Sequence, residues 1–432
     1  MQQADFVTLE MMYKFTAFLV FFFFLAIPIN SANAQSSKAN VLPTRLFGIT
    51  VDNVDDEAVV LEQLKLLRDA NPNNPLPVVR IVFDVDPNSQ NTENIDPKYF
   101  EIIKKIREQN LAFVMVQLLD SDDAHYCFKG DIDQKQSNLC FQKRTEAILN
   151  FTDNENRKLI DYVNIVEIGN EINGPWYGGH ENESAAIRKI ARETVISQLK
   201  IGYDIVEKLK RANPRNSIKT ALTFYFNDDG ARHNWMEKGE EDYKPDNAEY
   251  SMRKWVRENG KNFPHLDYSF VSYYSDDNWF TNPATKRREP IVPSATDWAV
   301  MFKEMQTNYS RAAVGFSEVG PQCHYKKIRG GKFIPTEFED ESVCEDRTCK
   351  PCQDDQSKSI TDHYLRLDKD VLNLLGNNFV GGYFYWNYNI DVINKIIYAN
   401  DLNNPKNTRL LRFNEAEATR NSLIDAFRKW SK

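Results

Sequence analysis

The chain has 432 residues, of which 12% are aromatic and 27% are charged, a length that fits one large domain or two of medium size. Its formal net charge is −8, and no run of Lys and Arg is long enough to follow a phosphate backbone. Nucleic acid is therefore excluded as the expected partner.

Residues 1–34 have the pattern of a signal peptide. Lys14 precedes the apolar run Phe15–Ile29, and the small residues of Ser31–Ala34 follow it, as a signal peptidase prefers. The run is shorter than the roughly 20 apolar residues of a membrane helix. We therefore expect a secreted protein, periplasmic if the source is bacterial, with no membrane contact in its mature form. An uncleaved membrane anchor is the alternative.

Six cysteines lie outside this segment, an even number that indicates disulfides in an exported chain. Cys127 and Cys140 are expected to close one loop. The other four cysteines form a cluster: Cys323, Cys344, Cys349 and Cys352. We expect two disulfides among them, and the sequence does not show which cysteines pair. Zinc ligation or a redox role is the alternative. If the source is eukaryotic, three sequons would accept glycans, at Asn150, Asn182 and Asn308.

Eight strand-like segments alternate with helical segments along the rest of the chain. They are rich in β-branched or aromatic residues, as buried parallel strands are. The predicted strands are Leu46–Val51, Val78–Phe83, Ala112–Leu118, Val163–Ile168, Lys219–Phe226, Tyr268–Tyr274, Ala312–Phe316 and Gly381–Trp386. This count predicts an α/β fold, a (β/α)8 TIM barrel. A doubly wound sheet has the same local pattern, but eight repeats and the lack of a nucleotide-binding glycine motif favour the barrel.

Residues 42–432 are expected to form this barrel as a single domain. Predicted helices lie at Glu57–Arg68, Tyr99–Gln109, Ala185–Lys210, Ala248–Asn259, Asp297–Tyr309, Ile360–Leu375 and Glu415–Trp430. Long loops follow strands three, five, six and seven, at residues 119–139, 227–247, 275–296 and 319–358. In a barrel these loops lie on the C-terminal face, where active sites are built.

Two of the predicted strands run into glutamates. The fourth is followed by Gly169-Asn170-Glu171, and the seventh by Ser317-Glu318. Strands four and seven of a closed barrel can face each other across its mouth, so the two carboxyl groups are expected to converge there. Such a pair suits glycoside hydrolysis, in which one carboxyl group is protonated and the other is ionised. A polar turn or a helix cap is the alternative explanation for either glutamate alone.

With these motifs the sequence resembles the retaining glycoside hydrolases of clan A, the 4/7 superfamily of (β/α)8 barrels. The resemblance implies that Glu171 is the general acid/base, that Glu318 is the nucleophile, and that Asn170 holds the 2-hydroxyl of the sugar. It is specific only at these short motifs. It does not identify a family within the clan, because Ser272 stands where several families have histidine.

The same resemblance implies three further contacts. Arg80 would lie beside the nucleophile, Tyr274 would hydrogen-bond to it, and Trp386 would lie under the −1 sugar. Tyr273 replaces Tyr274 if the strand register changes by one residue. Alternatively, Arg80 pairs with a structural acid such as Asp84, and Trp386 is a core aromatic.

Other polar and aromatic residues near the predicted rim carry weaker signals. Trp176 and Trp279 suit the apolar face of a sugar, although packing under a loop explains them equally well. Asp84, Gln117 and Asp120 end strands two and three, where they could bind sugar hydroxyls or simply be solvated. His180 and His324 also lie near the predicted rim, but a single histidine is more often a hydrogen-bonded polar residue than a catalyst.

These observations together predict a secreted retaining β-glycosidase that acts on a carbohydrate and needs no cofactor and no metal. A transglycosylase would use the same residues. A barrel that only binds carbohydrate is the alternative from another class of protein, because fold alone does not guarantee activity.

Overall fold

The structure is a computed structural model that describes residues 42–70, 75–83, 96–120, 127, 133–174, 184–212, 217–226, 252–273, 279–282, 287–290, 293–310, 312–319, 325–327, 333–335, 362–386, 388, 392–401 and 406–430. Side chains are described for most of these residues. The chain divides into two compact units, Met1–Leu42 and Pro43–Lys432, and the second unit contains the fold that follows.

Eight parallel strands close into a barrel. Around the barrel their order is β1, β12, β9, β6, β5, β4, β3 and β2, and each strand pairs in parallel with both neighbours. Their bounds are β1 Leu46–Val51, β2 Val78–Ile81, β3 Phe113–Gln117, β4 Ile165–Gly169, β5 Lys219–Tyr225, β6 Tyr268–Tyr273, β9 Ala313–Val319 and β12 Gly381–Tyr385. The predicted (β/α)8 barrel is thus confirmed.

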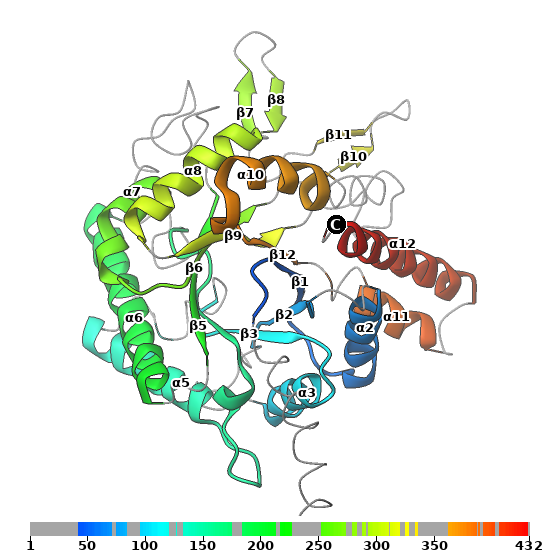
Figure 1. Cartoon of the computed structure of the whole chain (residues 1–432), viewed down its shortest axis with the longest axis horizontal. Coiled ribbons are helices and arrows are strands. Elements are labelled where there is room, and N and C mark those ends of the chain that lie inside the picture. Colours follow the sequence, from blue (N-terminus) through cyan, green and yellow to red (C-terminus); the bar gives the residue numbers. More distant parts are fainter. Residues whose placement is uncertain are drawn as a thin grey trace, which may run out of the picture. The chain divides into compact units, whose positions relative to one another are not determined.

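Helices surround this barrel (Figure 1). They are α2 Glu57–Asp69, α3 Pro97–Glu108, α5 Gln134–Asn150, α6 Ala185–Ala212, α7 Met252–Asn259, α8 Ala295–Asn308, α10 Asp368–Leu375, α11 Asn394–Asn400 and α12 Lys406–Trp430. Short helical turns occupy η1 Leu159–Tyr162, η3 Gly260–Asn262, η5 Asp362–Leu367 and η6 Gly376–Asn378. Side-chain caps fix several helix starts: Asp56 accepts from the backbone of α2, and Ser294 forms a capping box with Asp297 at α8.

The structure corrects several sequence-based boundaries. The predicted loop at residues 119–139 is shorter, because α5 begins at Gln134. The loop at 275–296 contains a hairpin of β7 Trp279–Asn282 and β8 Arg287–Pro290, and the loop at 319–358 contains a second hairpin, β10 Tyr325–Lys327 and β11 Phe333–Pro335. Residues 227–247 lie outside the described ranges. Strand β9 extends past Phe316 to Val319, so that Glu318 lies within the strand rather than after it.

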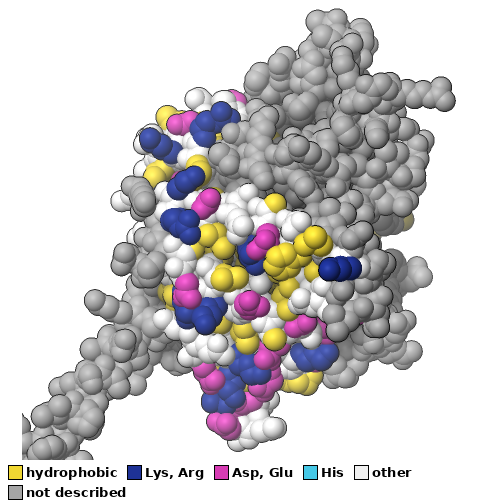
Figure 2. All heavy atoms as spheres, turned by 90° about the vertical axis from the view of Figure 1, so that its right-hand side faces the viewer, with side chains coloured by type: hydrophobic (Ala, Val, Ile, Leu, Met, Phe, Trp, Pro, Cys, Tyr) yellow, Lys and Arg dark blue, Asp and Glu magenta, His cyan; other side chains and the backbone are white. Residues whose placement is uncertain are grey.

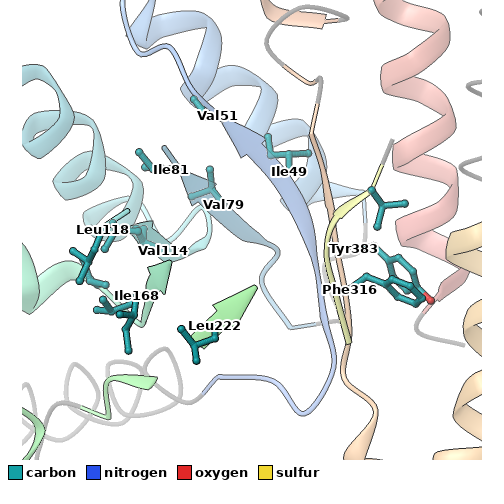
Figure 3. Close-up of a cluster of buried hydrophobic side chains, with 14 of the residues drawn as sticks. Ile49, Val51, Val79, Ile81, Val114, Leu118, Ile168, Leu222, Phe316 and Tyr383 are labelled. Carbon is teal, nitrogen blue, oxygen red and sulfur yellow. The ribbon is translucent and has the colours of Figure 1, made fainter. Parts of the chain in front are cut away.

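The apolar core lies between the barrel strands and the helices. Side chains alternate along each strand, so that every second residue points away from the barrel axis. Figure 3 shows part of this layer, which includes Ile49, Val79, Val114, Ile168 and Leu222 from five neighbouring strands. The opposite faces of the strands point into the barrel, and there the buried side chains include the charged and polar groups of the candidate site.

A disulfide joins Cys127 to the first half of α5, as the sequence predicted. It links Cys127 to Cys140, with Cα atoms 5.5 Å apart. Ser137, one turn before Cys140 in α5, donates a hydrogen bond to the Cys127 carbonyl oxygen. These contacts anchor Cys127, which follows strand β3, to the helix. The four cysteines of the second predicted cluster lie outside the described residues.

The face of the molecule drawn in Figure 2 carries acidic and basic side chains side by side, with small apolar areas between them. Within the described ranges, no helix combines the length and the apolar character needed to cross a bilayer. The described residues also include no group of three His, Cys, Asp or Glu side chains placed as metal ligands.

Candidate functional site at the barrel mouth

Glu171 follows β4 in a turn that its neighbours hold from both sides. The backbone NH of Asn170 donates to the Leu119 carbonyl oxygen (2.9 Å), and that of Ile172 donates to the Thr223 carbonyl oxygen (3.1 Å). These bonds tie the turn to the segment after β3 and to β5. Glu171 has φ 49°, in the left-handed region that non-glycine residues seldom adopt. Such a conformation costs about 1–3 kcal/mol and persists only where surrounding contacts impose it, often at functional sites.

The side chain of Asn173 adds a further clamp on this turn. Its amide nitrogen donates to the Tyr225 carbonyl oxygen (3.0 Å), and its amide oxygen accepts from the Tyr225 backbone NH (2.8 Å). Asn173 therefore joins the turn to the end of β5. This explains the polar sequence Asn170-Glu171-Ile172-Asn173: its backbone and amide groups fix the orientation of one carboxyl group.

Each of the two strands that present the glutamates carries a bulge beside them. On β4, Glu167 and Gly169 oppose the consecutive residues Ala221 and Leu222 of β5. On β9 the register with β6 also shifts, between the pairs that precede and follow Glu318. A bulge turns the side chains that follow it, and bulges are frequent next to active sites. The irregular register therefore helps to aim both carboxyl groups at one point.

That point is the hydroxyl group of Ser272 on β6. Its Oγ lies 2.7 Å from Oε1 of Glu171 and 3.2 Å from Oε2 of Glu318. These two carboxyl oxygens are therefore at most 5.9 Å apart, the sum of 2.7 Å and 3.2 Å. All three side chains are buried, and the glutamates keep only 7% and 2% of their surface exposed. The structure thus brings together the two glutamates predicted to converge from strands four and seven.

Asn170 and Arg80 hold the other oxygen of Glu318. The Asn170 amide donates to Oε1 of Glu318 (3.0 Å) and to Asp120 (3.3 Å). Arg80 Nη1 lies 2.6 Å from the same Oε1 in a fully buried ion pair. A cation and an amide donor both favour the ionised carboxylate. The position expected for Arg80, beside Glu318, is thus observed.

Arg80 also binds a third glutamate, Glu167 of β4. Its Nε donates to Glu167 (2.7 Å), and its Nη2 donates to Gln117 (2.6 Å). Burial alone would lower the pKa of Arg80, but Glu167 and then Glu318 outweigh it and raise that pKa, so that the guanidinium stays charged. Burial raises the pKa of Glu167, against the opposing effects of Arg80 and of the Thr223 hydroxyl, which donates to it.

Glu167 was not predicted as a site residue, although the sequence carries a usable signal for it. A charged residue in the middle of a buried apolar strand requires a partner, because an unpaired buried charge is costly. Glu167 on β4 and Arg80 on β2 both meet this description, and the structure pairs them. Asp84, the alternative partner considered for Arg80, lies outside the described residues.

The remaining predicted site residues divide into four groups. The Trp386 ring is half-buried and lies 5.8 Å from the guanidinium of Arg80, at the site. Tyr273 is wrong as the alternative to Tyr274, because its ring packs against Phe226 and Trp298 in the layer between strands and helices. Trp279 is described only as part of the β7 backbone. The other four lie outside the described residues: Tyr274, Trp176, His180 and His324.

Comparison with known proteins finds similar solved structures but no match by sequence. No protein-family model matches the chain, and no curated protein matches it. Similar solved structures include a β-glucosidase from Thermotoga maritima in complex with glucoimidazole, which is 11% identical over 81% of this chain and 89% of that chain, with a TM-score of 0.47. A β-glucosidase from Exiguobacterium marinum is 11% identical over 80% and 90% of the two chains, with a TM-score of 0.45. A GH10 endoxylanase from a sugarcane soil metagenome is 9% identical over 79% and 86%, with a TM-score of 0.47.

Proposed function

We propose that this protein is a secreted retaining β-glycoside hydrolase that cleaves a poly- or oligosaccharide by double displacement. The observation that carries the proposal is the convergence of Glu171 and Glu318 on the Ser272 hydroxyl, with carboxyl oxygens at most 5.9 Å apart, the sum of 2.7 Å and 3.2 Å. Retaining enzymes hold their two carboxyl groups about 5–5.5 Å apart, whereas inverting enzymes separate them by about 6.5–9.5 Å. Because Glu171 and Glu318 both contact the Ser272 hydroxyl, their separation supports the shorter spacing of the retaining enzymes.

The surroundings support a division of roles between the two glutamates. Arg80 and Asn170 both contact Oε1 of Glu318, and both favour its ionised form. Glu318 is thus suited to attack the anomeric carbon. Glu171 would carry the proton that the leaving oxygen takes as the glycosidic bond breaks and the covalent glycosyl ester forms on Glu318. The ionised Glu171 would then remove a proton from water as that water releases the sugar from the ester.

Alanine variants with added azide test the two roles separately. With an activated aryl glycoside, azide should restore turnover to Glu171→Ala and give a glycosyl azide of retained configuration, because Glu318 still forms the ester. With Glu318→Ala, azide would replace the nucleophile and give the inverted product. Glu62→Ala changes an exposed glutamate of α2 and should behave as the wild type. Full activity of Glu318→Ala without azide would rule out the assignment.

Export is proposed on the N-terminal sequence pattern and on the Cys127–Cys140 disulfide, since disulfides persist in oxidising compartments. N-terminal sequencing of the secreted protein should find a start near residue 35. Mass analysis of the products would separate hydrolysis from transfer to a second sugar.

A further inference from the structure

Ser272 is the one side chain among the described residues that the structure places within hydrogen-bond distance of both Glu171 and Glu318. Its side chain is fully buried. A serine hydroxyl has one hydrogen to donate and two lone pairs with which to accept. It can therefore donate to only one of the two carboxyl groups at a time. The second contact is favourable only when that carboxyl group carries a proton and donates it to Oγ.

We propose that Ser272 is a positioning residue that couples the protonation of the two glutamates, so that one is protonated while the other is ionised. The inference rests on the proposed function and deepens it. In the resting enzyme, protonated Glu171 would donate to Ser272 Oγ, and the Ser272 hydroxyl would donate to ionised Glu318. Once Glu171 has given its proton to the leaving group and Glu318 is an ester, the hydroxyl would turn and donate to Glu171. Serine gains and loses no proton in this cycle.

The charged neighbours determine which of the two glutamates carries the proton in the resting state. Arg80 lies 2.6 Å from Glu318 and holds that carboxylate ionised, which leaves the proton to Glu171. Asp120 and Glu167 face the same region, and a negative charge on either of them would favour a proton on the pair. Among the described residues, the titratable and charged groups around Ser272 are Arg80 on β2, Asp120 after β3, Glu167 on β4, Glu171 after β4 and Glu318 on β9.

The coupling can be measured without any turnover. The full chain would be labelled with [δ-¹³C]glutamate, and the two carboxyl signals would be assigned with Glu171→Gln and Glu318→Gln and followed by NMR against pH. We expect two separated titration steps in the wild type. In Ser272→Ala the steps should approach each other by about one pH unit, because the hydrogen bond that favours one ionised and one neutral group is lost. Ser272→Thr retains a hydroxyl and should keep most of the separation.

Ser269→Ala is the matched control. Ser269 lies on the same strand, is equally buried, and its hydroxyl has no hydrogen-bond partner among the described residues. The control removes the same hydroxyl group but should leave the titration of Glu171 and Glu318 unchanged. Thermal unfolding of each variant would show whether it folds. If Ser272→Ala does not fold, Ser272→Cys keeps nearly the same size with a weaker donor and should give an intermediate separation.

The outcomes distinguish this inference from the proposed function. An unchanged separation in folded Ser272→Ala, or in Ser272→Cys where alanine is not tolerated, would overturn the role of Ser272 and leave glycoside hydrolysis untouched. A wild type that hydrolyses no glycoside, yet whose two titration steps merge in Ser272→Ala, would refute the proposed function and support the coupling.

Discussion

Replacing Arg80 with methionine should destabilise the protein by about 3–5 kcal/mol at neutral pH, because removing one member of a buried ion pair leaves the other charge unpaired. The structure places this loss toward the upper end of that range, because Arg80 pairs with two glutamates. Arg80 lies 2.7 Å from Glu167 and 2.6 Å from Glu318, and none of the three side chains is more than 2% exposed. Since a typical domain unfolds at a cost of about 5–15 kcal/mol, the variant would keep only part of its stability.

The loss should depend on pH in a defined direction. Burial already raises the pKa of Glu167 in the wild type, and Arg80 opposes that rise. Without Arg80, Glu167 should keep its carboxyl proton to a higher pH in the folded protein than in the unfolded chain. Stability from such a group is fully present below its unfolded pKa, about 4.3, and is lost as the pH rises through its folded pKa. The Arg80→Met variant should therefore approach the wild type near about pH 5 and fall furthest behind near about pH 8.

Urea unfolding followed by tryptophan fluorescence at both pH values measures this difference. Arg107→Met is a suitable control, because Arg107 is also partly buried but contacts the Ala112 carbonyl oxygen and the Phe113 ring. Its loss of stability should change little between the two pH values. If Arg80→Met lost the same free energy of unfolding at both, packing rather than charge would explain the effect, and the electrostatic reasoning would be refuted.

Three further perturbations test separate parts of the structure. Asn170→Ala removes a charge-assisted hydrogen bond to Glu318 and should lower kcat/KM about 10–100-fold, whereas an unchanged value would show that this bond does not assist turnover. Replacing Cys127 and Cys140 by serine opens a loop with a sequence separation of 13 and should cost about 3 kcal/mol; equal thermal unfolding of the variant and the wild type would contradict the disulfide. Gly48→Ala places a Cβ atom 1.7 Å from a carbonyl oxygen of β2 and should cost more than about 3 kcal/mol in urea unfolding, so a well-folded variant would disprove the close strand contact.

The sequence predicted the barrel because buried parallel strands leave a strong local signal. The bounds of β1 were predicted without error, and those of β5 within one residue, since apolar runs rich in β-branched residues end at turns. The bounds of β9 were the poorest. The polar pair Ser317-Glu318 resembles a turn, yet both residues are buried and continue the strand.

Helix α5 was missed because its local signal is weak. The segment Gln134–Asn150 is polar along much of its length, and its buried residues include Ser137, Arg144 and Thr145 beside the apolar Phe141. Its start is fixed by the Asp133 side chain, which accepts from the backbone NH of Lys135 and of Gln136. Packing against α6 and the disulfide supplies the remaining support, and neither can be deduced from hydrophobic periodicity.

The candidate site was predicted only in part, because its residues are far apart in the sequence and meet only when the barrel closes. Glu171 and Glu318 could be placed because each comes shortly after a recognisable apolar run of a strand. Their common contact, Ser272, depends on the barrel closing with β6 between β5 and β9 and on the bulges that turn both glutamates. No local pattern specifies such a contact, so it could be found only in three dimensions.

The mouth of the barrel combines features that stability alone does not favour. Glu171 has a left-handed backbone conformation, two strands carry bulges, and the single guanidinium of Arg80 serves two buried carboxylates. Well-packed apolar side chains of similar volume would often be neutral or stabilising in place of a buried ion pair. Local conflicts of this kind are expected where a protein gives up stability for function. Their coincidence at the carboxyl ends of β4 and β9 supports a chemical role for these glutamates more strongly than the barrel fold does, because barrels of this kind serve many functions.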